Sequence, residues 1–321
     1  MITDQELIIY DAHGCPPFNS NNSLSVLERY KNASTTFLSL NVGFGEMTEN
    51  EILQIIENIQ LYVEEHKNSY MFISKPEDIY LCKKENKLGI AFDLEGTDWI
   101  NNDLHKIEKL YTLGVRQMLL VYNKSCKAGA GYDDKKNGLT AYGKSIVREM
   151  NKVGMIVDCS HTACKTTFDI METSLEPVVF SHSNPDALCK HDRNITDDQI
   201  KACAETGGVI GISGIGIFLG DNNTSTERLA EHIDYIVQLV GIEHVGIGLD
   251  YVFDHDEVKA IVKKTPQLYP EKQGYHDVNL TEPEQIPQLI LPLQKKGYSN
   301  NDINAIMGGN FLRVANRVWK S

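Results

Sequence analysis

The chain has 321 residues, of which 41% are hydrophobic, and its formal net charge at pH 7 is −13. This size allows a large buried core, in one α/β barrel or in two ordinary domains, and the acidic balance argues against a nucleic-acid-binding surface. No apolar stretch approaches the length of a membrane span, residues 1–6 lack a signal-peptide pattern, and residues 316–321 show no anchor tail. Seven cysteines without framework spacing fit free thiols in a reducing compartment, so we expect a soluble, cytoplasmic protein.

Short apolar runs alternate along the chain with polar segments of helical length. The first run, residues 7–10, leads into Asp11, His13, Cys15 and two prolines, which is typical of a strand that ends in a loop. Residues 48–65 have the apolar spacing of an amphipathic helix, and Thr48 with Glu51 offers a capping box at its start. The further predicted strands are residues 36–42, 88–94, 115–121, 155–161, 177–183, 209–215 and 244–250. The further predicted helices are residues 104–113, 139–152, 162–175, 196–206, 225–240, 285–295, 301–307 and 310–319, the last after a break at Gly308 and Gly309.

About eight strand-then-helix units follow one another without a change in composition. This pattern predicts a single (β/α)8 TIM-type barrel domain over residues 1–321, with extra helices at the carboxyl end. A doubly wound open sheet is the alternative, but the first turn lacks the glycine-rich dinucleotide fingerprint. The long polar loop of residues 124–137 is of a length that is usually functional.

Two adjacent predicted strands end in the same dipeptide, Ser160-His161 and Ser181-His182. Parallel strands joined by a crossover helix place their carboxyl ends side by side, so the two histidines should be neighbours at one rim of the sheet. Neutral imidazoles held together there are natural metal ligands. The alternative is that each is an ordinary loop or core histidine.

Other chemically active side chains follow the remaining strands. The strand ends carry Asp11, His13, Cys15, Glu95, Tyr122, Asp158 and Asp250. Histidines, carboxylates and a thiol that converge on a barrel rim have the composition of a metal site, with Glu95 as the candidate bridge between two metals. Asp250 can take a proton from water or bind a substrate ammonium group, or it is an ordinary loop aspartate. Arg193 can bind a substrate carboxylate with both arms of its guanidinium, although arginines in polar loops are usually only solvated.

Several collinear segments resemble the renal (membrane) dipeptidases, a family of amidohydrolase-type metal barrels. The segments are residues 138–140, 147–151, 154–161, 177–183, 193–194, 207–209, 244–250 and 308–313. Members of that family are zinc-dependent and cleave dipeptides with two metals bridged by a glutamate. The resemblance implies that Glu95 is the bridge, that His161 and His182 complete one zinc site, and that His13 belongs to the other. It also implies proton transfer by Asp250, carboxylate binding by Arg193, and the dimers that the family often forms.

The chain departs from the family pattern at two positions. The family has an aspartate two residues after the first histidine, where this chain has Cys15, and a thiolate can also bind zinc. Well-studied members have a substrate-contacting histidine where this chain has Tyr122, whose hydroxyl can still donate to a developing oxyanion. We therefore expect a zinc dipeptidase with two metals, or one if Cys15 is no ligand. The alternatives are hydrolysis of N-acyl amino acids or lactones by the same site, and a metal-depleted barrel that only binds a ligand.

Overall fold

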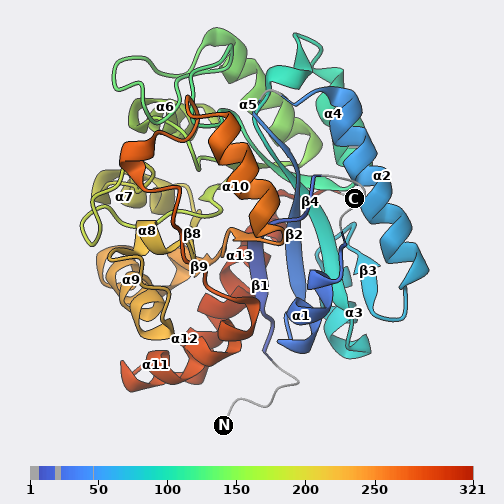
Figure 1. Cartoon of the computed structure of the whole chain (residues 1–321), viewed down its shortest axis with the longest axis vertical. Coiled ribbons are helices and arrows are strands. Elements are labelled where there is room, and N and C mark those ends of the chain that lie inside the picture. Colours follow the sequence, from blue (N-terminus) through green and yellow to red (C-terminus); the bar gives the residue numbers. More distant parts are fainter. Residues whose placement is uncertain (1–6, 19–22, 46, 321) are drawn as a thin grey trace.

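The computed structural model describes residues 7–18, 23–45 and 47–320. Parallel strands form a barrel, and the pairing of Asp11 in the first strand with Ile247 in the last strand closes it (Figure 1). The barrel strands are β1 (Tyr10–Cys15), β2 (Phe37–Phe44), β4 (Leu88–Glu95), β5 (Val115–Leu119), β6 (Ile156–Asp158), β7 (Val178–Phe180), β8 (Val209–Ile212) and β9 (Val245–Ile247). The predicted (β/α)8 architecture is confirmed.

Helices surround the barrel, and all of them except the helix of residues 255–264 pack mainly against it or against one another. They are α1 (Val26–Asn32), α2 (Glu49–Glu65), α3 (Glu77–Glu85), α4 (His105–Thr112), α5 (Ala141–Val153), α6 (Cys164–Thr173), α7 (Asp197–Glu205), α8 (Gly216–Leu219), α9 (Thr226–Val240), α10 (His255–Lys264), α11 (Ile290–Lys295), α12 (Asn300–Asn304) and α13 (Asn310–Val318). The short strands β3 (Tyr70–Phe72) and β10 (Tyr251–Val252) extend the sheet beside β4 and β1. Within the described residues, no helix is both long and apolar enough to cross a membrane.

The helix α2 illustrates how local sequence determines these elements. Its apolar residues recur every three or four positions, and the same residues are buried against the barrel: Ile52, Ile55, Ile56, Ile59 and Val63. The hydroxyl of Thr48 accepts from the backbone N–H of Glu51, and the Glu51 carboxylate accepts from the backbone N–H of Thr48. The predicted capping box is therefore present, and it satisfies N–H groups that have no partner within the helix.

Close backbone contacts fix the carboxyl end of β7. A Cβ atom on Gly211 or Gly248 would lie only 2.0 or 1.8 Å from the carbonyl oxygen of Ser181. Only glycine therefore lets the neighbouring backbone approach Ser181 this closely. The tight packing holds the peptide that carries His182 in place.

The structure corrects two details of the predicted elements. The first strand was expected to comprise the apolar run of residues 7–10 and to empty into a loop at Asp11, His13 and Cys15, but β1 runs from Tyr10 to Cys15, so that Asp11 and His13 lie within the strand. Their side chains are buried at the barrel's carboxyl-terminal end, where Oδ1 of Asp11 accepts from the backbone N–H of Leu249 and Nδ1 of His13 contacts Asp93. The expected break at Gly308 and Gly309 is also wrong, because a π-helical turn, Ala305–Gly309, joins α12 to α13 without interruption.

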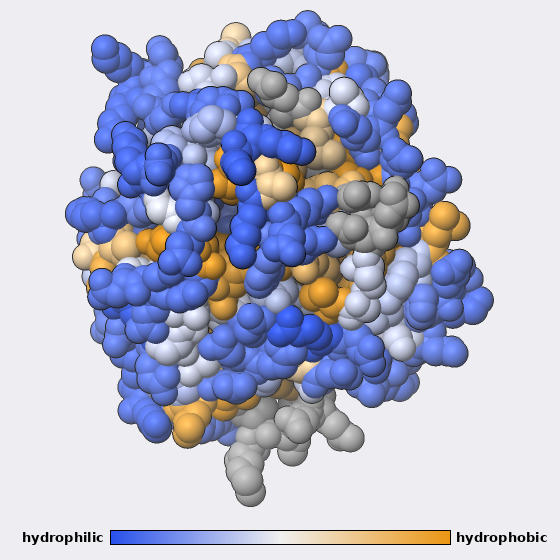
Figure 2. Space-filling view, viewed as in Figure 1, coloured by the Kyte–Doolittle hydropathy of each residue, from blue (hydrophilic) through white to orange (hydrophobic). Residues whose placement is uncertain are grey.

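Residues 251–281 form a covering segment that the sequence did not predict. This covering segment contains β10, α10 and the 3-10 turn Glu271–Gln273, and α10 lies across the carboxyl ends of the strands in Figure 1. Hydrophilic side chains dominate the face seen in Figure 2, and apolar residues appear in the hollows between them. Four other elements, α1, β3, α3 and α8, were also not predicted, and each has nine residues or fewer.

Candidate metal centre and active site

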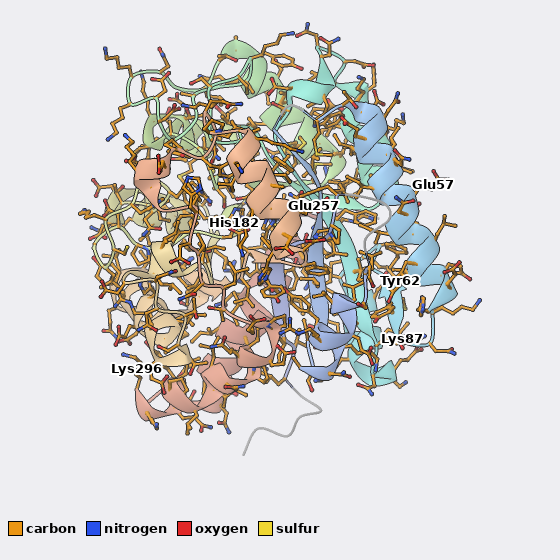
Figure 3. All side chains as sticks on the ribbon, viewed as in Figure 1. Glu57, Tyr62, Lys87, His182, Glu257 and Lys296 are labelled. Carbon is orange, nitrogen blue, oxygen red and sulfur yellow. The ribbon has the colours of Figure 1, made fainter. Side chains whose placement is uncertain are left out.

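Four strand ends bring together one carboxylate and three imidazoles. The Oε1 atom of Glu95, at the end of β4, lies 3.1 Å from Nε2 of His161 and 3.4 Å from Nε2 of His182. The same oxygen lies 3.8 Å from Nε2 of His13 in β1. All four side chains are buried, and Figure 3 labels His182 in the interior. The structure thus brings His13, Glu95, His161 and His182 together at one rim of the barrel, as the sequence predicted.

A hydrogen bond to the opposite ring nitrogen orients each imidazole. The Nδ1 atom of His13 lies 2.9 Å from Oδ1 of Asp93, and that carboxylate oxygen accepts from the ring N–H. The Nδ1 atom of His182 lies 2.7 Å from the hydroxyl of Ser181, and that hydroxyl in turn donates to Asp158. Because the single hydroxyl proton is used toward Asp158, Ser181 accepts from the N–H of His182. Both rings thus have Nε2 on the side of Glu95, and in the neutral His182 ring that atom carries the lone pair.

The amide of Asn123 orients the third imidazole in the same way. Its Oδ1 atom lies 2.6 Å from Nδ1 of His161. The Nε2 atoms of His161 and His182 then face each other at 2.8 Å, with lone pairs and no proton between them. Oε1 of Glu95 lies beside both and has no hydrogen-bond partner although it is buried. Such converging lone pairs repel one another, so these residues fit a bound cation.

The protonation preferences of Glu95, His161 and His182 agree with that conclusion. For His13, the lowering effect of burial is outweighed by the acidic neighbours of the ring, Asp93 first among them, which raise its pKa well above the usual value, so a metal there would displace a proton. Burial raises the pKa of Glu95 to about 8, with His13 opposing the shift, so the buried carboxyl needs a nearby cation to be ionised at neutral pH. Burial also lowers the pKa values of His161 and His182 well below the usual value, which keeps both rings neutral. Neutral imidazole is the form that binds a metal.

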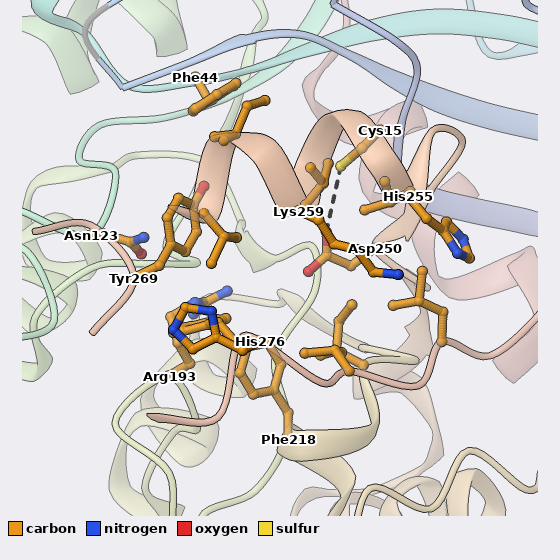
Figure 4. Close-up of a pocket in the computed structure, with 18 of the residues that line it drawn as sticks. Cys15, Phe44, Asn123, Arg193, Phe218, Asp250, His255, Lys259, Tyr269 and His276 are labelled. Atoms are coloured by element: carbon orange, nitrogen blue, oxygen red, sulfur yellow. Dashed lines mark hydrogen bonds between the residues drawn. The ribbon is translucent and has the colours of Figure 1, made fainter. Parts of the chain in front are cut away.

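A second group of potential ligands adjoins the first. The Sγ atom of Cys15 lies 3.5 Å from Nε2 of His13 and 3.6 Å from Oδ1 of Asp250, to which it donates (Figure 4). Nε2 of His13 is also 3.6 Å from the same Asp250 oxygen. Burial raises the pKa of Cys15 to about 12, with His13 lowering it in part, so without a metal Cys15 is a neutral thiol. His13, Cys15 and Asp250 are close enough to share one ion.

Three residues of the site have left-handed backbone conformations. The φ angles are +58° at Asn123, +62° at His161 and +60° at Asp250. Such angles are unfavourable for side chains other than glycine, and asparagine and aspartate tolerate them best. The chain turns sharply after β5, β6 and β9 at these residues, which aims their side chains into the centre of the rim.

A cavity of about 400 Å³ opens above these groups (Figure 4). Arg193 is almost fully buried in its wall, its guanidinium lies 5.4 Å from the ring centre of Phe218, and Nη2 has no hydrogen-bond partner. The ring of Tyr122 stacks on His161 with centroids 4.5 Å apart, and its hydroxyl lies 2.5 Å from that of Tyr269. The covering segment closes the outer side with apolar residues of α10, including Val258, Ile261 and Val262.

All eight predicted site residues lie in or directly beneath this one cavity: His13, Cys15, Glu95, Tyr122, His161, His182, Arg193 and Asp250. The sequence prediction missed the residues that orient the imidazoles, Asp93, Asn123 and Ser181. A signal existed for Asp93, because it lies two positions before Glu95 on the same face of a strand. Asp158 was noted only as a strand-end residue, and its Oδ1 atom accepts from the backbone N–H groups of both Ser160 and Ser181.

Comparisons with known proteins agree with the fold. A crystal structure of an amidohydrolase from Pseudomonas aeruginosa superposes with a TM-score of 0.88 at 25% identity, covering 98% of each chain. A metallopeptidase from Rhodobacter sphaeroides, crystallised with a phosphinate mimic of the dipeptide L-Ala-D-Ala, superposes with a TM-score of 0.81 at 18% identity, covering 98% of this chain and all of the other.

Sequence comparisons relate the chain to dipeptidases. An uncharacterised dipeptidase of Schizosaccharomyces pombe is 30% identical over 282 residues, which are 84% of this chain. The chain spans only 62% of that relative's length. The profile of the membrane dipeptidase family matches residues 34–320, nearly the whole barrel. The chain therefore belongs to the membrane dipeptidase family, peptidase family M19.

Proposed function

We propose that this barrel is a zinc-dependent dipeptidase. The observation that carries the proposal is the convergence of three buried Nε2 atoms on the partnerless Oε1 atom of Glu95. Glu95, His161 and His182 would hold one zinc ion, and His13, Cys15 and Asp250 would hold a second one beside Glu95. Zinc bound there would polarise the substrate carbonyl and lower the pKa of a water molecule.

The residues of the cavity would hold the two ends of a dipeptide. The buried guanidinium of Arg193 has an unused donor, Nη2, and can bind the free carboxylate with two parallel hydrogen bonds. The carboxylate of Asp250 lies at the metal end of the same cavity and can bind the ammonium group. A cavity of about 400 Å³ falls at the small end of the range for small-molecule sites, which supports a dipeptide-sized substrate.

Asp250 and Tyr122 would handle protons and developing charge. Burial raises the pKa of Asp250, with His13 and Arg193 opposing the shift, which makes this carboxylate a better proton acceptor. Burial raises the pKa of Tyr122 well above the usual value, so its hydroxyl stays protonated. In the pair of Tyr122 and Tyr269 hydroxyls, one proton is used between the oxygens and the other remains free to donate to an oxyanion.

The domain organisation and the cellular location are further parts of the proposal. We propose that residues 1–321 form one barrel domain. All seven cysteines are free thiols, which supports a reducing, cytoplasmic location.

A zinc assay combined with a substrate screen tests the proposed function. Metal-free protein would be titrated with zinc, and its ion content would be measured alongside hydrolysis of a dipeptide library with L- and D-residues. We expect two zinc ions per chain and hydrolysis of free dipeptides that stops in the His182→Ala variant. Cleavage of N-acyl amino acids or lactones alone would refute the proposed substrate, and a protein that binds no zinc would refute the proposed chemistry.

A further inference from the structure

The covering segment is bound to the barrel by polar contacts around its turn at residues 265–274. The hydroxyl of Tyr132 donates to Oε1 of Gln273 at 2.9 Å, and Nε2 of His191 donates to the Gln273 carbonyl at 3.2 Å. The Gln273 amide donates to Asp192 at 3.0 Å. These contacts lie at the outer end of the turn. The inner end, at Leu268 and Tyr269, reaches the metal centre.

Asn123 contacts both the covering segment and a metal-centre histidine. Its Nδ2 atom donates to the backbone carbonyl of Leu268 at 3.2 Å, and its Oδ1 atom lies 2.6 Å from Nδ1 of His161. A carbonyl can only accept, so the Leu268 oxygen requires the NH₂ side of the amide to face it. The amide oxygen must then face His161, and it can only accept a proton from that ring.

The orientation of the amide therefore determines the tautomer of His161. With Nδ1 protonated toward Asn123, the neutral ring has its lone pair on Nε2, which faces Glu95 at 3.1 Å. If the Leu268 carbonyl moved away, Asn123 would lose the hydrogen bond that fixes the orientation of its amide. A flipped amide would donate to Nδ1, and the proton of His161 would then lie on Nε2, where it blocks metal binding.

Tyr122, the residue before Asn123, makes a parallel connection. Its ring stacks on His161 at 4.5 Å and 26°, and its hydroxyl bonds to Tyr269, the residue after Leu268. Two consecutive residues of the loop after β5 thus contact two consecutive residues of the covering segment, and both also contact His161. Figure 4 shows Asn123 and Tyr269 side by side at one end of the cavity.

We propose that Asn123 is a positioning residue that couples closure of the covering segment to metal binding by His161. The inference rests on the proposed zinc site and adds a form of regulation to it. A closed covering segment fixes the amide, the amide fixes the tautomer, and the tautomer presents Nε2 to the metal. Because binding linkage is reciprocal, zinc must stabilise the closed segment as much as the closed segment favours zinc.

Two substitutions of Asn123 separate its contact with Leu268 from its contact with His161. Asn123→Asp keeps an acceptor for His161 and removes the donor to Leu268, and aspartate tolerates the φ of +58°. Asn123→Gly removes both contacts without backbone strain. We expect Asn123→Asp to keep the zinc affinity and to lose the coupling, whereas Asn123→Gly weakens zinc binding by about 10- to 100-fold.

Amide hydrogen exchange measured by mass spectrometry, with and without zinc, tests the coupling. The amides of Leu268, Tyr269 and Gln273 are hydrogen-bonded within the turn and report its opening. In the unmodified protein we expect zinc to slow their exchange about 5-fold or more, and in Asn123→Asp we expect this effect to disappear. Peptides from α5 serve as the internal control, because that helix lines no part of the cavity.

The outcomes distinguish this inference from the proposed function. Zinc binding without slower exchange in residues 265–274, or equal slowing in the unmodified and Asn123→Asp proteins, would overturn the coupling and leave the dipeptidase proposal intact. Equal zinc affinity in Asn123→Gly and the unmodified protein would overturn the positioning role. A protein that binds no zinc would overturn both proposals.

Discussion

The buried hydroxyl of Ser181 provides a test of how the metal centre is oriented. This hydroxyl donates to Asp158 and accepts from Nδ1 of His182 at 2.7 Å, and Ser181 is fully buried. Ser181→Ala leaves the imidazole N–H of His182 without an acceptor. It also leaves Oδ2 of Asp158 with only the amide of Gln117, at 3.5 Å.

The expected loss of stability in Ser181→Ala follows from the two groups that lose a hydrogen-bond partner, the His182 ring N–H and Oδ2 of Asp158. Each buried polar group without a hydrogen bond costs about 1–3 kcal/mol, so we expect the free energy of unfolding of the metal-free protein to fall by about 2–6 kcal/mol. Without an acceptor at Nδ1, the tautomer of His182 that has Nε2 free is no longer favoured. Loss of such an orienting partner typically reduces metal affinity by about 10- to 100-fold, or about 1.4–2.7 kcal/mol.

Zinc affinity would be measured by competition with a chromogenic chelator, and stability by urea unfolding of the metal-free protein. Ser160→Ala is the matched control, because Ser160 is equally buried and its hydroxyl contacts the Ser181 hydroxyl and the backbone N–H of His182, each at 3.3 Å, rather than an imidazole nitrogen. We expect that control to lose some stability and little zinc affinity. Equal zinc affinities in the two alanine variants would refute the orienting role of Ser181.

Three further changes test other parts of the site and fold. Arg193→Lys should raise KM about 10- to 100-fold for dipeptides with a free carboxylate, since lysine cannot form the two-pronged contact, and should leave KM for amide-capped dipeptides unchanged. Cys15→Ala should lose one of two zinc ions, whereas Cys15→Asp should keep both, and an unchanged zinc count in the alanine variant would show that Cys15 is no ligand. Burial lowers the pKa of His232 to about 4, so the unfolded state binds its proton more readily and stability falls with pH below about 6.5. At pH 5 the loss relative to pH 8 is about 2 kcal/mol, and it should be absent in His232→Gln, whose amide can still donate to the Leu219 carbonyl.

The barrel was predictable because its strands are fully buried and its helices are amphipathic. Runs such as residues 88–92 are apolar on both faces, and the face of α2 follows from the spacing of its isoleucines. The covering segment was not predictable on those terms. Only one of the ten residues of α10 is buried, and the rest of the segment is mostly irregular, so its position depends on tertiary contacts.

The candidate site also has a part that the sequence predicts and a part that depends on tertiary contacts. Strand order alone brings His161 beside His182, because parallel strands end at one rim, and any histidine after either strand would lie there. The proton positions on those rings depend on contacts that strand order does not specify. Asn123 takes its orientation from a carbonyl 145 residues further along the chain, and nothing in either local sequence indicates that pairing. A sequence can therefore identify the metal-binding side chains of such a barrel, whereas the tautomers that let them bind depend on the loops that close over them.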